Sequence, residues 1–164
     1  MSDSQFTHLD SAGAARMVDV SGKEVTARTA TATGRVIVSA EVVALLRGSG
    51  VPKGDAIAVA RIAGIAAAKR TPDLIPLCHP IAIHGVNVDL EVHDDHVAIT
   101  ATVRTADRTG IEMEALTCVA VAGLALIDMV KAVDPAAVIT DVLLVEKTGG
   151  KTGVWRRDDR GSVS

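Results

Sequence analysis

Hydrophobic and polar residues alternate along three stretches of the chain, and each alternation predicts a β-strand. Residues 24–38 alternate and are rich in β-branched side chains, while residues 86–92 and 97–103 place apolar side chains at every second position. Such alternation puts one face of a strand in the core and leaves the other face polar. The last two stretches flank Asp94-Asp95 and are predicted to pair as a hairpin. Residues 138–146 are predicted to form a fourth strand.

Three segments between these strands have the features of helices. Ser39 is a suitable N-cap for the first, and Thr71-Pro72 is expected to end the second, because proline disfavours a helical conformation at the preceding residue. The predicted helices cover residues 40–47, 53–69 and 111–133. The order strand, helices, strand, strand, helix, strand is typical of an α+β, ferredoxin-like split βαβ fold, which is a four-stranded antiparallel sheet with helices packed on one face.

The size and composition of the chain favour a single domain. It has 164 residues, of which 48% are hydrophobic, and Phe6 and Trp155 are its only aromatic residues. The core is therefore expected to consist of Ala, Val, Ile and Leu. We predict a mobile N-terminal arm over residues 1–22, one domain over residues 23–156 and a polar tail over residues 157–164.

Charge and cysteine content narrow the range of partners. A net charge of −3 and few aromatic residues argue against nucleic acid or an anionic membrane. Cys78 and Cys118 are too few for a disulfide framework, and the N-terminus lacks a signal pattern, so a cytoplasmic location is expected. The apolar run from Ala115 to Ile127 is expected to be too short for a bilayer and to form a helix buried in the protein or at a subunit interface.

The loop from Lys69 to Pro80 brings together cations, a thiol, an imidazole and three prolines. Each proline fixes its own φ and restricts the residue before it. The loop is therefore predicted to be stiff and to hold Cys78 and His79 in place. Such a loop suits an anionic substrate, and it suits a rigid connector equally well.

Carboxylates and a lysine mark the two ends of the long predicted helix. Glu112 and Glu114 lie in its first turn, where the helix dipole alone favours acidic residues, although carboxylates there could also accept N–H groups of a ligand. Asp128 and Lys131 are three residues apart and can form an ion pair. Their apolar neighbours predict partial burial. A structural bridge and a proton-transfer pair are equally good interpretations of this pair.

Further lysines lie beside glycines or at a helix end. Lys53 and Lys69 bracket the second predicted helix, about 24 Å apart, so they are expected to serve different active sites or subunits. The segment from Lys147 to Gly153 holds three glycines and a second lysine, Lys151, and could cradle an anion. It is not a Walker A loop, because Val145 stands where that pattern needs glycine. A mobile loop is the simpler interpretation of the segment alone.

The five histidines do not predict a metal site. No two of them have the spacing of a helical metal-binding pair, and the chain has no C-x-x-C motif. His93 and His96 flank the predicted hairpin turn and are expected to face solvent. His79 is the one histidine whose surroundings indicate a function.

Taken together, the motifs closely resemble the cyclic pyranopterin monophosphate synthase family, protein C (MoaC) of molybdenum cofactor biosynthesis. The resemblance covers the chain from Thr7 to about Trp155 and shows no departure at a motif position. It rests on Met-Val-Asp-Val (17–20), Lys-Gly-Asp (53–55), Ala-Arg-Ile-Ala-Gly-Ile (60–65), Ala-Ala-Lys-Arg-Thr (67–71), Leu-Ile-Pro-Leu-Cys-His-Pro (74–80), Gly-Ile-Glu-Met-Glu-Ala-Leu-Thr (110–117), Asp-Met-Val-Lys-Ala-Val (128–133) and Lys-Thr-Gly-Gly-Lys-Thr-Gly (147–153).

This resemblance implies a lyase that converts (8S)-3′,8-cyclo-7,8-dihydroguanosine 5′-triphosphate into cyclic pyranopterin monophosphate and releases pyrophosphate. It also implies a ferredoxin-like fold and a homohexamer, a trimer of dimers with active sites between subunits. Asp128 and Lys131 would be the catalytic acid/base pair. The substrate-binding residues would be Leu77, Cys78, His79, Glu112, Met113, Glu114, Lys53, Lys69, Lys147 and Lys151.

Two other functions stay open at this point, and so does the need for a metal. The chain could be a non-catalytic nucleotide-binding module, or an enzyme that forms a Schiff base on Lys131. No metal-ligand cluster or other cofactor motif is evident, and a Mg²⁺ ion on the substrate phosphates remains an alternative.

Overall fold

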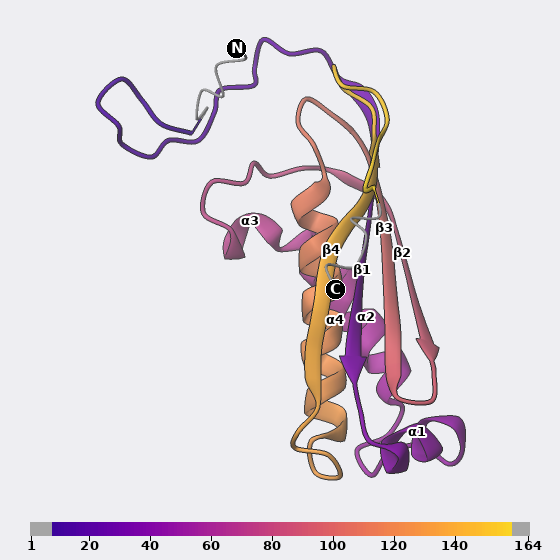
Figure 1. The fold of residues 1–164 in the computed structure, drawn as a ribbon. Helices are drawn as coiled ribbons and strands as arrows, with labels where there is room; N and C mark the ends of the chain where they lie inside the picture. The colour runs from indigo at the N-terminus through magenta and orange to yellow at the C-terminus, as the bar shows by residue number, and fades with distance from the viewer. Residues whose placement is uncertain (1–7, 159–164) are drawn as a thin grey trace.

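The computed structural model describes residues 8–158, which contain five strands and four helices (Figure 1). The predicted arm and tail therefore lie partly outside the described residues, which exclude 1–7 and 159–164. The elements in order are β1 (Thr26–Ile37), α1 (Ala40–Arg47), α2 (Ala56–Lys69), α3 (Thr71–Leu74), β2 (Ile83–Val92), β3 (His96–Asp107), α4 (Glu112–Val130), β4 (Val138–Thr148) and β5 (Trp155–Arg156).

The sheet has the order β2-β3-β1-β4-β5, and all neighbouring strands are antiparallel. The four predicted strands and the hairpin at Asp94-Asp95 are confirmed. The prediction of a four-stranded sheet is wrong, because Trp155 and Arg156 form a fifth strand beside β4. Two residues cannot show an alternating pattern, so this strand has no periodic signal in the sequence.

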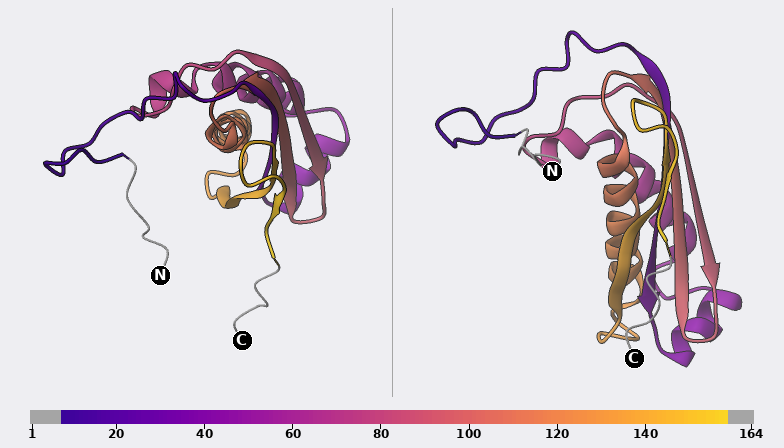
Figure 2. Two further views of the ribbon diagram at one scale, coloured as in Figure 1. Left: turned by 90° about the horizontal axis from the view of Figure 1, so that it is seen from above. Right: turned by 45° about the horizontal axis from the view of Figure 1, so that its top comes forward.

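Helices α2 and α4 cover one face of the sheet (Figure 2). On β1 the alternation predicted a buried face, and Ala30, Ala32 and Val36 are indeed buried beneath α4. The two helices pack closely: a Cβ added to Gly64 of α2 would lie 2.9 Å from the Cys118 carbonyl oxygen of α4. Small side chains at this contact explain how a core with so few aromatic residues is filled.

Local signals account for most helix boundaries. Ser39 and Asp55 cap α1 and α2 by accepting backbone N–H groups at 3.3 and 3.0 Å. Thr71-Pro72 does end α2, but it also begins the short helix α3, since proline is tolerated in a first helical turn. Helix α4 ends at Val130 and not at Val133, because the Val133 N–H bonds to the Val130 carbonyl only three residues back, and the Asp134 N–H closes the turn on the same carbonyl.

Among the described residues, α4 is the one helix whose length and apolar composition would allow it to cross a membrane. It has 19 residues, and its most apolar 18-residue window has a mean hydropathy of 1.9. The helix is longer than the apolar run from Ala115 to Ile127 on which the prediction of a buried helix was based. It is the central helix of the fold, and its buried residues include Ala115, Cys118 and Leu126.

The antiparallel arrangement of α2 and α4 gives the molecule two distinct ends. The start of α4 lies near the end of α2 and near α3, whereas the start of α2 lies near the end of α4. Residues 8–25 extend away from the sheet on the side where α3 lies (Figures 1 and 2). The candidate functional residues divide between these two ends.

Candidate active site

The first cluster lies at the N-terminal end of α4 and contains an ion pair. Lys147 of β4 donates to the Glu112 carboxylate at 2.8 Å, and both side chains are about one-third exposed. Met113 of the same helical turn is exposed. The Lys147 ammonium occupies one oxygen of the Glu112 carboxylate, and a carboxylate can accept further N–H groups through its second oxygen.

Glu114 lies one residue beyond Met113 in an opposite environment. Its side chain is buried, with the whole residue 2% exposed, and no cation among the described residues pairs with it. Burial raises the pKa of Glu114 to about 7, and the nearby charge of Glu112 acts in the same direction. Two carboxyl groups of one helical turn thus differ in environment: Glu112 pairs with a lysine, and Glu114 is buried and partly protonated near neutral pH.

The loop after α3 adds a thiol and an imidazole to this end. Burial raises the pKa of the Cys78 thiol, and the charge of Glu114 contributes to the same effect. Cys78 is therefore a neutral wall of the site and a poor nucleophile. Its neighbours Leu77 and His79 are half-buried, and His79 Nε2 bonds to the Val18 carbonyl of the N-terminal segment.

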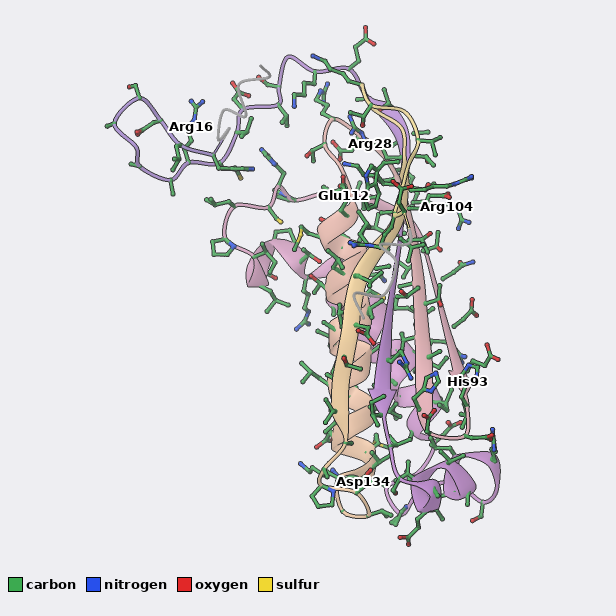
Figure 3. The ribbon with its side chains drawn as sticks, in the orientation of Figure 1. Arg16, Arg28, His93, Arg104, Glu112 and Asp134 are labelled. Atoms are coloured by element: carbon green, nitrogen blue, oxygen red, sulfur yellow. The ribbon has the colours of Figure 1, made fainter. Side chains whose placement is uncertain are left out.

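A basic hollow of about 590 Å³ adjoins the Glu112 end, and sequence reasoning did not single out most of its residues. Besides Lys151, it is lined by the cationic residues Lys23, Arg28 and Arg108. Arg28 lies in a strand whose sequence shows only the usual alternation of apolar and polar residues. Lys23 and Arg108 lie in loops, so no local sequence pattern marks these three residues. Arg28 and Glu112 lie at the same end of the molecule, opposite Asp134 (Figure 3).

The glycine-rich segment forms the tight turn between β4 and β5, not a free loop after a last strand. Gly149 and Gly150 have φ values of +91° and +74°, which favour glycine. A Cβ on Gly149 would lie 2.2 Å from the Ala27 carbonyl oxygen, so only glycine allows this turn to approach the start of β1. The prediction of an anion cradle is consistent with the position of this turn beside Arg28.

The second cluster lies at the other end of α4. Asp128 accepts from Lys131 at 2.8 Å and from Lys53 at 3.2 Å. The hydrogen bond from Lys131, followed by that from Lys53, holds the pKa of Asp128 below its ordinary value. The predicted partial burial of the Asp128–Lys131 pair is wrong for the isolated chain, because both side chains are 57% exposed. The sequence pattern missed this exposure because α4 turns its buried stripe away from Asp128.

The two clusters cannot act on the same atom within one chain. Sixteen residues separate Glu112 from Asp128 on one helix, which corresponds to about 24 Å. Lys53 lies with Asp128, and Lys69 lies at the other end of α2, in a shallow hollow lined also by Ile62 and Arg70. The predicted separation of the two lysines is confirmed.

No group of three or more His, Cys, Asp or Glu side chains that could hold a metal occurs within residues 8–158. His93 and His96 stack on each other with ring centroids 4.5 Å apart near the turn of the β2–β3 hairpin, remote from Glu112 (Figure 3). The prediction that both face solvent holds for His93, but the His96 side chain is only 18% exposed.

Comparison with known proteins places the chain among the MoaC proteins. Residues 17–150 match the model of the MoaC family. The cyclic pyranopterin monophosphate synthase of Nocardioides sp. is 70% identical over 96% of this chain and 99% of its own length. The enzymes of the same name from Streptomyces coelicolor and Peptoclostridium acidaminophilum are 71% and 48% identical, over 93% and 94% of this chain and 90% and 98% of their own lengths. This chain belongs to the MoaC family.

Proposed function

We propose that the chain is a cyclic pyranopterin monophosphate synthase of molybdenum cofactor biosynthesis. It would convert (8S)-3′,8-cyclo-7,8-dihydroguanosine 5′-triphosphate into cyclic pyranopterin monophosphate and pyrophosphate. Family membership supports the reaction. The observation in the fold that carries the proposal is the adjacency of a carboxyl-rich surface and a basic hollow, which together suit the base and the triphosphate of one nucleotide.

The guanine-derived ring would bind against the N-terminal end of α4. Glu112 as a carboxylate can accept N–H groups, and Glu114 in its neutral form can donate a hydrogen bond. Hydrophobic and polar contacts would come from Met113 and from the loop residues Leu77, Cys78 and His79. This assignment gives each carboxyl group a different partner on the ring.

The triphosphate would lie in the basic hollow. Lys147 and Lys151, predicted from the sequence, would act there with Lys23, Arg28 and Arg108. The cyclic phosphate forms when a substrate hydroxyl oxygen attacks the α-phosphorus and the bond to the leaving pyrophosphate breaks. Positive charge around that phosphorus stabilises both the attacking alkoxide and the leaving group. Lys69 would contribute a further cation from the end of α2.

Asp128 and Lys131 would transfer the protons that ring opening and reclosure require. A general acid or base has to lie within about 3 Å of the proton it moves. A ring bound beside Glu112 is therefore out of reach of Asp128 and Lys131 in the same chain. We propose that a second subunit supplies this pair together with Lys53, in a homohexamer arranged as a trimer of dimers.

Exposed apolar residues along the two main helices support such an assembly. Ile62 of α2 is 67% exposed and Leu124 of α4 is 58% exposed, and Val59 and Met113 extend the two exposed stripes. Large apolar patches on a monomer mark interaction surfaces. The Leu124 stripe runs between the two clusters, so a partner that covers it would reach both.

The remaining proposals concern fold class, location and metal. The four long strands follow the order β2-β3-β1-β4 with helices on one face, which supports a ferredoxin-like split βαβ domain to which β5 is added.

A cytoplasmic location suits a small-molecule biosynthetic enzyme with two free cysteines. Catalysis is proposed to need no cofactor, with Mg²⁺ on the substrate phosphates as the alternative that chelation by EDTA would reveal.

A coupled assay of pyrophosphate and pterin product, started with the authentic cyclic nucleotide, tests the proposed reaction. Stoichiometric release of both products supports it. Binding of the nucleotide without turnover would instead identify a non-catalytic nucleotide-binding module. A borohydride-trapped substrate adduct on Lys131 would identify Schiff-base chemistry.

A further inference from the structure

The imidazole of His79 is attached to a segment far away in the sequence. Its Nε2 atom lies in hydrogen-bond contact with the backbone carbonyl of Val18. A carbonyl oxygen can only accept a hydrogen bond, so Nε2 must carry the proton. In the neutral ring the other nitrogen, Nδ1, is then left as an acceptor.

The segment that supplies this carbonyl is itself fixed by hydrogen bonds. Asp19 accepts the Ser21 N–H at 2.9 Å, which closes a turn, and the Lys23 N–H donates to the Val20 carbonyl at 3.0 Å. The Arg108 side chain donates to the Lys23 carbonyl at 3.0 Å and ties the segment to the loop before α4. Val18 and Val20 are half-buried, whereas Met17 and Asp19 are exposed.

The histidine is held from its own side as well. In the loop that carries it, the Cys78 N–H donates to the Ile75 carbonyl at 3.1 Å. The ring is therefore fixed between a proline-rich loop and the segment from residue 17 to residue 23.

We infer that the segment Met17–Val20 is a positioning element that keeps His79 in the Nε2–H tautomer and reserves Nδ1 as the acceptor for the substrate. The part that concerns the substrate rests on the proposed function, and the part that concerns the tautomer does not. Met17–Val20 would thus contribute to the site through its backbone, without a side chain of its own in contact with substrate.

Two substitutions separate the roles of the two ring nitrogens. In His79→Gln the amide nitrogen takes the place of Nε2 and can still donate to Val18, but nothing replaces Nδ1. In His79→Asn a polar group takes the place of Nδ1 and the contact with Val18 is lost. His84→Gln is the matched control, because His84 is an exposed histidine outside the loop.

The tautomer is measured by nitrogen NMR of the full-length protein labelled with ¹⁵N-histidine. We expect His79 to show the Nε2–H pattern, and an Nδ1–H pattern or an equal mixture would overturn the inference. Amide hydrogen exchange at Ser21 and Lys23, whose N–H groups are hydrogen-bonded within the segment, should stay at the wild-type rate in His79→Gln and His84→Gln and rise at least about tenfold in His79→Asn. Equal rates in His79→Gln and His79→Asn would also overturn it.

Turnover then tests the role of Nδ1. We expect His79→Gln to lose at least about 100-fold in activity although the Ser21 and Lys23 amides exchange at the wild-type rate. Wild-type activity in His79→Gln would overturn the role of Nδ1 in substrate recognition. If the wild-type protein does not turn over the cyclic nucleotide, the proposed function fails, while the NMR result still decides whether Val18 sets the tautomer.

Discussion

The two ends of α4 carry acidic residues in contrasting environments. At the N-terminal end Glu114 is buried without a cation, and its pKa rises to about 7. At the C-terminal end Asp128 is 57% exposed between two lysines, and its pKa falls below its ordinary value. One end therefore holds a carboxyl group that can keep its proton near neutral pH, and the other holds a carboxylate.

The contrast also supports the proposal that the active site lies between subunits. A buried, shaped surface with a neighbouring basic hollow suits binding, and its Lys147–Glu112 pair is only about one-third exposed. The Asp128–Lys131 pair has the chemistry for proton transfer and is more exposed, but the basic hollow described above lies at the other end of α4. Bringing the two ends together across an interface would supply both functions at one place. It would also bury Asp128, which strengthens its interactions with both lysines.

The largest expected effect is at the C-terminal end. Asp128→Asn or Lys131→Ala should lower the rate of pyrophosphate release by about 100- to 10,000-fold, because each removes a group that transfers protons. Circular dichroism should show a folded protein, since the pair is exposed on the surface. Asp94→Asn breaks a comparable exposed pair with Arg47 and should leave the rate unchanged. Full activity of both site variants would refute the catalytic assignment.

The next effect concerns stability at the N-terminal end. The pKa of Glu114 is about 7 in the folded chain, against an ordinary value of 4.5. Between these two values the folded state binds more protons than the unfolded state, so stability falls as the pH rises through this window. The cost above pH 7 is about 3 kcal/mol, which is the difference between the two pKa values at about 1.4 kcal/mol per unit.

Glu114→Gln should remove this pH dependence. Urea unfolding at several pH values between 4.5 and 8 measures it, with Glu112→Gln as the partner variant at the same helix end. The variant should gain stability relative to the wild type as the pH rises. Parallel curves for the wild type and Glu114→Gln would contradict the pKa shift that burial is expected to cause.

A smaller effect is expected in the basic hollow. Arg28→Met should raise the KM for the cyclic nucleotide about tenfold, with a smaller change in kcat, because it removes one charge from the triphosphate site. Arg35→Met is the control on the same strand, since Arg35 pairs with Asp141 well away from the hollow. An equal change in KM for both variants would mean that the hollow does not bind the phosphates.

The smallest effect is expected from the second lysine beside Asp128. Lys53→Met removes the weaker of the two hydrogen bonds that lower the pKa of Asp128, so this pKa should rise part of the way to its ordinary value. The acid limb of the kcat–pH profile should therefore move to higher pH. A limb that stays in place would show that Asp128 does not control that part of the profile.

Much of the fold follows from local sequence signals. Alternation located the four long strands, and the cap Ser39 placed the start of α1. The start of α2 was predicted at residue 53, but Asp55 caps the helix and it begins at Ala56. Strand β5 was missed because two residues hold no pattern, and it is defined only by its pairing with β4. The end of α4 was missed because it depends on a turn closed by the Asp134 N–H.

Less of the candidate site than of the fold could be predicted from the sequence. The residues of the recognised motifs do gather at the two ends of α4, but their exposure depends on which face α4 turns to the sheet. Lys23, Arg28 and Arg108 come from three separate segments that only the fold brings together. The contact between Val18 and His79 spans 61 residues and leaves no local trace in the sequence.

The central claim is that the two ends of α4 from different subunits form one active site. Co-expression of a Glu112→Gln/Glu114→Gln variant with a Lys131→Ala variant, carrying different tags so that mixed oligomers can be purified, tests it most directly. Each variant alone should be nearly inactive. In a mixed oligomer of equal parts, about a quarter of the interface sites should combine two intact ends. If the two ends meet across subunits, pyrophosphate release by the mixed oligomer should recover to about a quarter of the wild-type rate. A mixed oligomer that stays as inactive as the two variants would contradict the shared site.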